Sequence, residues 1–163
     1  MDYTEKIQPF DVIIVYNPLS LLHRLIKGVT HEKAGHVALY VGDDTIAEAS
    51  SKGIDYKKIK TYKPKAIVKL ARAKRLTEEK KGIIKSYCGL VIGQKYAFIQ
   101  LIAIWIKYLL KLKWIPDADR DAQICSEFVA NAFRVAGIRV IVNKEPHETV
   151  PGDFLKSMEF EIL

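Results

Sequence analysis

The sequence has little cysteine, and the two thiols are not arranged for crosslinking. Cys88 and Cys125 are the only cysteines among 163 residues, and they form neither a CxxC pair nor the spacing of a zinc site. A disulfide framework is therefore not predicted, although one bridge between the two remains formally open. We expect no cofactor and no bound metal ion, so each cysteine is either core packing or a nucleophile.

A secretory signal is also missing from the start of the chain. The first sixteen residues, MDYTEKIQPFDVIIVY, include acidic side chains and lack a long apolar stretch followed by a small-residue cleavage site. The sequence as written predicts a cytoplasmic protein, and the mature form of a secreted precursor would look the same. Internal repeats and low-complexity segments are absent too, and the length fits one domain spanning 1–163.

Basic residues outnumber acidic ones. Lys plus Arg number 26 against 19 for Asp plus Glu, which gives a net charge of +7 and makes anionic surfaces candidate neighbours. The basic residues between 63 and 75 have no interleaved aromatic residues and match no nucleic-acid module, so we interpret them as a solvated face and do not predict nucleic-acid binding. Residues 53–62 are interpreted as a lysine-rich connector.

The clearest local pattern predicts a helix that begins at a cysteine. Apolar side chains recur every three or four residues from Ile124 to Ala136, and Gly137 follows where a helix would end. Cys125 would lie in the first turn, where unpaired N–H groups and the helix dipole stabilise a thiolate and can bind an oxyanion. A buried cysteine is usually core packing, as we expect for Cys88, so a nucleophile needs a basic partner.

Two alternating segments upstream supply such a partner. The segments HVALYV and TIAEAS flank a Gly-Asp-Asp turn, a pattern typical of a β-hairpin. If the turn is a three-residue loop, Val41 pairs with Thr45, and His36 and Glu48 share one face as diagonal neighbours. A two-residue loop would instead place them on opposite faces.

The sequence contains the three residue types of a thiol hydrolase site, at Cys125, His36 and Glu48. The cysteine would be the nucleophile, the histidine its base, and the carboxylate would hold the imidazole in one tautomer and orientation. A histidine on a half-buried strand is often structural when it stands alone. The combination of all three residue types favours catalysis.

Three segments resemble a known family. GHVALYVGDDTIAEAS at 35–50, ICSEFVANAFRVAGI at 124–138 and TVPGDFLKS at 149–157 are similar to the permuted NlpC-type papain-like hydrolases, the YiiX-like group, in which histidine precedes cysteine. The resemblance implies an α+β, papain-like fold with an antiparallel sheet packed against the helix that carries the cysteine. It also implies a nucleophile at Cys125, a base at His36, a polar third member at Glu48 and an oxyanion contribution from Tyr96.

The chain departs from the family pattern at three positions. Phe10 stands where the family usually has glycine before the first aspartate, Gly35 stands where it has serine or threonine, and Ala97 stands where it has aspartate after the tyrosine. None of these changes removes a catalytic atom. They concern the surroundings of the site and the substrate side.

The most apolar segment is 96–114, YAFIQLIAIWIKYLLKLKW. Its few polar residues fall on one narrow stripe. The apolar part before the lysines, about 15 residues, is shorter than the roughly 20 residues needed to cross a bilayer. We expect a buried helix that borders the mouth of the Cys125 site; a helix lying in a membrane interface or covering an acyl chain is the alternative.

The three site residues predict a cysteine hydrolase, and the resemblance implies an amidase or peptidase that acts on a small or cell-wall-type peptide. The first alternative is a lipid-directed thiol esterase or acyltransferase similar to the lecithin:retinol acyltransferase relatives, for which an anionic membrane surface would be a partner. The second is a module that binds an amino acid or peptide without turnover. Nothing in the sequence specifies an oligomeric state.

Overall fold

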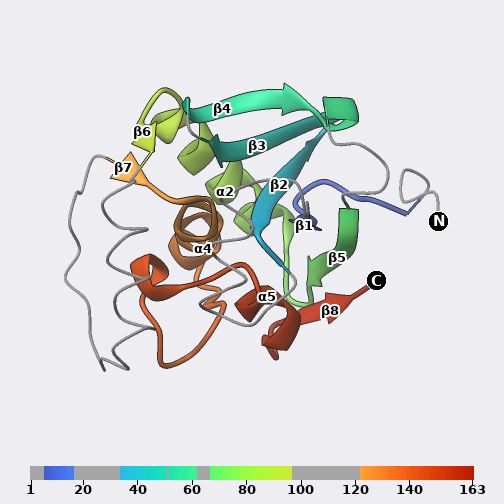
Figure 1. Cartoon of the computed structure of the whole chain (residues 1–163). Coiled ribbons are helices and arrows are strands. Elements are labelled where there is room, and N and C mark those ends of the chain that lie inside the picture. Colours follow the sequence, from blue (N-terminus) through green and yellow to red (C-terminus); the bar gives the residue numbers. More distant parts are fainter. Residues whose placement is uncertain (1–5, 17–33, 51, 62–66, 97–121) are drawn as a thin grey trace.

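A six-stranded antiparallel sheet runs through the computed structural model, which describes residues 6–16, 34–50, 52–61, 67–96 and 122–163 (Figure 1). Its order is β4-β3-β2-β1-β5-β8, and a separate parallel pair joins β6 to β7. The strands are β1 (Val12–Val15), β2 (His36–Gly42), β3 (Thr45–Ser50), β4 (Gly53–Lys58), β5 (Ile67–Ala73), β6 (Lys95–Tyr96), β7 (Ala122–Gln123) and β8 (Phe160–Ile162). The helices are α2 (Glu78–Val91), α4 (Cys125–Val135) and α5 (Asp153–Lys156), with 3-10 turns η2 (Ile59–Thr61) and η4 (Pro146–Glu148).

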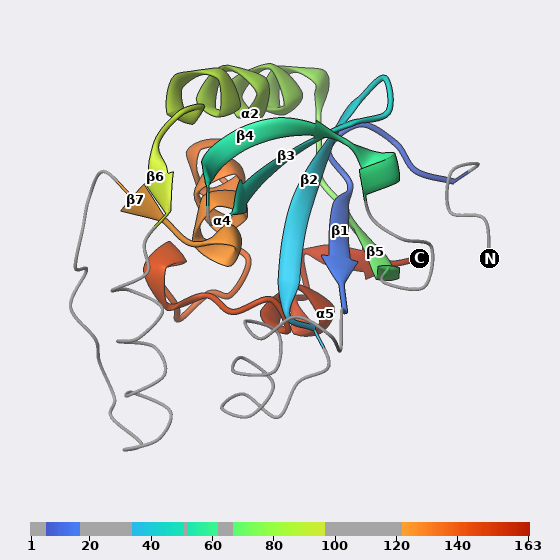
Figure 2. The same ribbon diagram turned by 45° about the horizontal axis from the view of Figure 1, so that its top comes forward.

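Helices cover one face of this sheet. Helix α4 packs on β2 and β3, and α2 packs beside α4 (Figure 2). The α+β class and the antiparallel sheet packed against the cysteine-bearing helix are therefore confirmed. No helix among the described residues is long and apolar enough to span a membrane.

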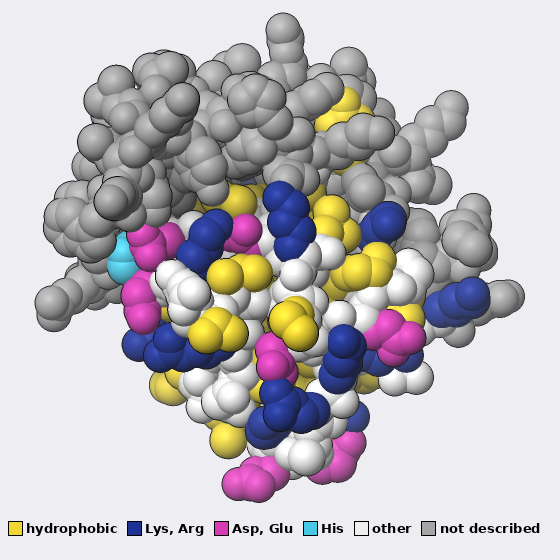
Figure 3. All heavy atoms as spheres, turned by 90° about the horizontal axis from the view of Figure 1, so that it is seen from below, with side chains coloured by type: hydrophobic (Ala, Val, Ile, Leu, Met, Phe, Trp, Pro, Cys, Tyr) yellow, Lys and Arg dark blue, Asp and Glu magenta, His cyan; other side chains and the backbone are white. Residues whose placement is uncertain are grey.

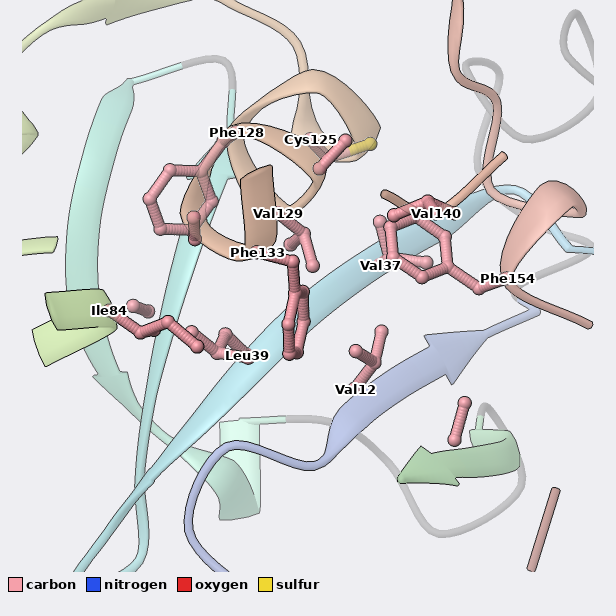
Figure 4. Close-up of a cluster of buried hydrophobic side chains, with 14 of the residues drawn as sticks. Val12, Val37, Leu39, Ile84, Cys125, Phe128, Val129, Phe133, Val140 and Phe154 are labelled. Atoms are coloured by element: carbon pink, nitrogen blue, oxygen red, sulfur yellow. The ribbon is translucent and has the colours of Figure 1, made fainter. Parts of the chain in front are cut away.

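Strand alternation divides the apolar side chains between the two faces of the sheet. Val12 and Leu39 point into the larger cluster, beneath Phe128 and Phe133 of α4 (Figure 4). Their sequence neighbours point into a smaller cluster on the other face, which contains Ile13, Val15, Ala38, Tyr40, Ile46 and Leu70. Because β1 is buried on both faces, its sequence is a continuous apolar run, as is typical of a fully buried strand.

The β2–β3 hairpin loop is shorter than predicted. Asp43 and Asp44 alone form it, and their φ values of 50° and 55° are those of a two-residue type I′ turn. Gly42, and not Val41, pairs with Thr45. The hairpin therefore has the two-residue loop, for which the sequence alone predicted His36 and Glu48 on opposite faces.

A β-bulge compensates for the shorter loop. The pairing shifts by one residue between Tyr40 and Gly42, so the pairs farther from the turn keep the predicted register. His36 and Glu48 consequently lie on the same face, as the hydrogen bond between them also requires. The predicted juxtaposition is correct, although the predicted cause was not.

Helix α4 ends where the sequence predicted. Gly137 has a φ of 74°, a left-handed conformation that costs glycine little. Its N–H donates to the carbonyl of Arg134 at 2.9 Å, and the N–H of Ile138 donates to the carbonyl of Phe133 at 2.9 Å. These two bonds satisfy carbonyls of the last turn, as in a Schellman-type ending.

The backbone around Gly53 leaves no room for a side chain. Its φ is 109°, and an added Cβ would lie 2.6 Å from the backbone oxygen of Gln94. We expect Gly53→Ala to lower the free energy of unfolding by about 3 kcal/mol through strain and overpacking. In Gly82→Ala a Cβ meets open space on α2, so this control should gain about 0.5–1 kcal/mol. Urea unfolding of both variants measures the contrast, and equal midpoints would contradict it.

Candidate active site

Cys125 is the first residue of α4, as the sequence predicted. Ile124, the N-cap residue, has no side-chain acceptor for the N–H groups of the first turn. The carboxylate of Glu127 instead accepts the N–H of Ile124 at 3.5 Å. The N–H of Ser126 bonds to the cysteine sulfur and lowers its pKa. The helix start therefore directs backbone dipoles toward the thiol.

His36 and Glu48 form a buried pair at the other side of the sulfur. His36 Nε2 and Glu48 Oε2 are 2.8 Å apart, and both side chains are almost fully buried. With Nε2 donating to the carboxylate, Nδ1 is the ring nitrogen that faces Cys125. The structure thus brings together all three residues for which the sequence predicted a joint role.

The electrostatics of this pair favour an ionised thiol. Burial raises the pKa of Cys125, but the positive charge of His36, the hydrogen bond from its ring and the N–H groups of Val37 and Ser126 outweigh burial and lower that pKa. Burial likewise lowers the pKa of His36, but the charge of Cys125 and the bonds to Cys125 and Glu48 raise it to about 10. Both shifts favour a thiolate–imidazolium pair over a neutral thiol and a neutral imidazole.

The contact of Val37 with the sulfur has a geometric origin in the sheet. The N–H of Tyr40 donates to the carbonyl of Asp11 in the direction of β1, so by alternation the N–H of Val37 points toward β3. Pairing between β2 and β3 begins only at Leu39. The N–H of Val37 is consequently available to the sulfur of Cys125, and the start of α4 meets the sheet at this end.

Cys88 has the opposite character. It is completely buried on α2, and burial raises its pKa to about 12. A thiol with that pKa carries almost no thiolate at neutral pH. The interpretation of Cys88 as core packing is consistent with both observations.

Two residues of the site, Lys57 and Ser50, were not predicted from the sequence. Lys57 Nζ lies 2.6 Å from Glu48 Oε1 and 3.0 Å from Ser50 Oγ. The prediction of a connector at 53–62 was wrong, because Gly53–Lys58 is strand β4 and pairs along its whole length with β3. Alternation along GIDYKK was the signal that could have revealed a lysine on the face of Glu48.

Two polar anchors hold the start of α4. Buried Gln123 accepts a hydrogen bond from the hydroxyl of Tyr87 at 2.9 Å and donates to Gln94 at 3.1 Å, which ties the residues before the helix to α2 and its following turn. On the other side, Ser126 Oγ donates to the carbonyl of Thr149 at 2.6 Å. The segment beginning at Thr149, one of the three that carry the family resemblance, thus contacts the first turn of the cysteine helix.

For Tyr96, the structure describes the backbone alone. Tyr96 pairs with Gln123, two residues before Cys125, in the short parallel ladder of β6 and β7. Its side chain and residues 97–121 lie outside the described residues. The predicted oxyanion role of Tyr96 and the predicted helix at 96–114 therefore stay predictions.

Comparisons with known proteins concern the fold. No model of a known family matches the sequence, and no curated protein matches it. A solved structure does match: the crystal structure of metalloprotein yiiX from Escherichia coli O157:H7, DUF1105, superimposes with a TM-score of 0.72. The superposition covers 96% of each chain at 17% sequence identity. The chain therefore has a YiiX-like fold.

The description of yiiX as a metalloprotein prompts a test of the donor groups here. Within the described part of the chain, no three His, Cys, Asp or Glu side chains are placed to hold a metal ion. His36 already uses Nε2 for Glu48, and its ring also bonds to Cys125. The arrangement of these described side chains does not fit a metal centre.

Proposed function

We propose that this protein is a cysteine hydrolase that cleaves an amide by acyl transfer through Cys125, His36 and Glu48. The observation that carries the proposal is the connected, buried set of nucleophile, base and carboxylate at the start of α4. The YiiX-like fold supports it only at the level of architecture. We extend the proposal to the finer classification, a permuted NlpC-type papain-like domain spanning 1–163, because histidine precedes cysteine along the chain.

The first half of the reaction would form a thioester. The Cys125 thiolate attacks the carbonyl carbon, and the electron pair of the C=O bond moves to oxygen, where N–H groups at the start of α4 stabilise the oxyanion. When the tetrahedral intermediate collapses, the C–N bond breaks and His36 gives its proton to the departing amine. Tyr96 is proposed as a second donor to the oxyanion.

The second half would release the acid. The now neutral His36 takes a proton from water, and the resulting hydroxide attacks the thioester carbonyl. Collapse breaks the C–S bond, which yields the carboxylic acid and restores the thiolate beside imidazolium. Glu48 keeps the ring oriented through both halves and stabilises its positive charge, without itself being protonated.

We propose a small or cell-wall-type peptide as the substrate, following the family resemblance. A panel of peptide amides and acyl esters should show turnover by the wild type of at least one amide. Cys125→Ala should lose at least about a thousandfold in rate, because the covalent step is removed. Cys88→Ala is the matched control and should keep the wild-type rate, since Cys88 lies in the core on α2.

The same panel tests the competing functions. Turnover of acyl esters alone would favour the lipid-directed esterase or acyltransferase and overturn the amidase proposal. Saturable peptide binding that is equal in wild type and Cys125→Ala, with no product, would favour a binding module. On the face shown in Figure 3, basic and acidic side chains of the described residues are intermingled, so the described part of that face presents no block of positive charge for an anionic membrane.

A further inference from the structure

Lys57 contacts Glu48 of the candidate triad. It lies on β4, a strand that carries none of the three triad residues. There it lies opposite Ile46, so it is the diagonal neighbour of Glu48 on the same face of the sheet. Its ammonium contacts Glu48 Oε1 at 2.6 Å, while Glu48 Oε2 contacts the ring of His36 at 2.8 Å. The two oxygens of one carboxylate are thus divided between a histidine and a lysine.

We propose that Lys57 is a positioning residue that completes a chain of alternating charge: Cys125 thiolate, His36 imidazolium, Glu48 carboxylate and Lys57 ammonium. The inference rests on the proposed function, because it assumes that the thiolate is the working form of Cys125. It adds a fourth member that acts only through Glu48. Ser50 Oγ, 3.0 Å from the ammonium, holds the lysine in place.

Charge balance is the physical reason for a fourth member. The thiolate, imidazolium and carboxylate together carry one net negative charge in a buried site, where uncompensated charge is costly. The ammonium brings the set to neutrality. The Lys57 side chain is 27% exposed, so its charge stays partly solvated while its contact with the carboxylate is buried on the Glu48 side. Lys57 therefore compensates Glu48 without a large desolvation cost of its own.

Two further carboxylates add negative charge around these four groups, which increases the need for a compensating positive charge. Asp55 is the direct cross-strand partner of Glu48 on β4, and Glu127 is buried in the first turn of α4. Negative charge on either carboxylate has the sign that disfavours a thiolate. The positive charge of Lys57 acts against them and keeps Glu48 ionised beside His36.

The pH dependence of Cys125 alkylation by iodoacetamide tests the proposal without any substrate. In Lys57→Met the loss of one positive charge should move the midpoint of the alkylation profile up by about one pH unit. Lys57→Arg keeps the charge and should stay close to wild type. Lys58→Met is the matched control: Lys58 is the next residue on β4, on the opposite face, and it bonds to the carbonyl of Asp43 and to Thr45 Oγ1.

The outcomes separate this proposal from the proposed function. A wild-type midpoint equal to that of a free thiol would overturn both. A low wild-type midpoint that is unchanged in Lys57→Met would overturn the role of Lys57 alone. An equal upward shift in Lys58→Met would also overturn it, because the effect would then come from general surface charge. Thermal unfolding of each variant is recorded in parallel. A shift of the alkylation midpoint supports the proposal when the variant unfolds cooperatively, which shows that it is folded.

Discussion

Iodoacetamide is expected to modify Cys125 at least about a thousandfold faster than Cys88 at neutral pH. Only the thiolate reacts, and the pKa of Cys88, raised to about 12 by burial, leaves roughly one part in 10⁵ ionised at pH 7. The positive charge of His36 and the hydrogen bonds to the sulfur lower the pKa of Cys125, which raises its thiolate fraction under the same conditions. The weaker nucleophilicity of a low-pKa thiolate reduces this advantage but does not cancel it. Mass spectrometry of the two cysteine-containing peptides measures both rates in one sample.

His36 is the source of this reactivity, so His36→Ala should slow the alkylation of Cys125 by about a hundredfold and leave that of Cys88 unchanged.

The pH dependence of hydrolysis follows from Cys125 and His36. Activity should rise with pH through the lowered pKa of Cys125 and fall above about 10, where His36 loses the proton it must give to the leaving group. Equal alkylation rates for the two cysteines in the folded protein would rule out an activated nucleophile.

Asp11→Ala should cost about 3 kcal/mol in the free energy of unfolding. The Asp11 carboxylate is 1% exposed, accepts two hydrogen bonds from Arg72 at 2.8 and 2.7 Å, and accepts the backbone N–H of Gln8 at 2.8 Å. Truncation removes the carboxylate from the guanidinium, which still donates to the carbonyl of Lys6, and leaves the N–H of Gln8 without this acceptor. Removing one partner of a buried ion pair is strongly destabilising. Denaturant unfolding followed by circular dichroism measures the change.

Glu159→Ala is the control for Asp11→Ala. Glu159 also makes two short contacts with an arginine, 2.6 and 2.8 Å from Arg75, but the arginine side chain is 74% exposed. Water and salt replace such a contact readily, so its midpoint should stay at the wild-type value. If both variants lost the same stability, burial would not be what distinguishes the two ion pairs.

Local patterns in the sequence predicted the elements that carry the site. The helix start at Cys125 and its end at Gly137 followed from apolar spacing and glycine chemistry, which act over a few residues. The strand at 53–58 was missed because its lysines obscured the alternation, and Lys57 was missed with it. A lysine partner becomes visible only when β4 is paired with β3, and pairing is a tertiary property.

Phe10 shows how a departure from a family pattern acquires a physical meaning. The resemblance marked it as standing where glycine is usual, and its φ in the structure is 72°. This left-handed backbone is one that glycine adopts at little cost and phenylalanine adopts with strain. The phenyl ring is buried with the main apolar cluster, which offsets that strain. Nothing in the sequence alone revealed the sign of φ at this position.

The bulge between Tyr40 and Gly42 limits how this hairpin can change in length. Whether His36 and Glu48 project from the same face of the sheet depends on the number of residues between them. Adding or removing one residue shifts the strand register by one and turns every side chain beyond that point to the other face. A single insertion or deletion in the loop would leave the sheet paired but point one partner away from the other. Lineages descending from such a protein should therefore vary this hairpin in steps of two residues, or recover single steps through a second bulge.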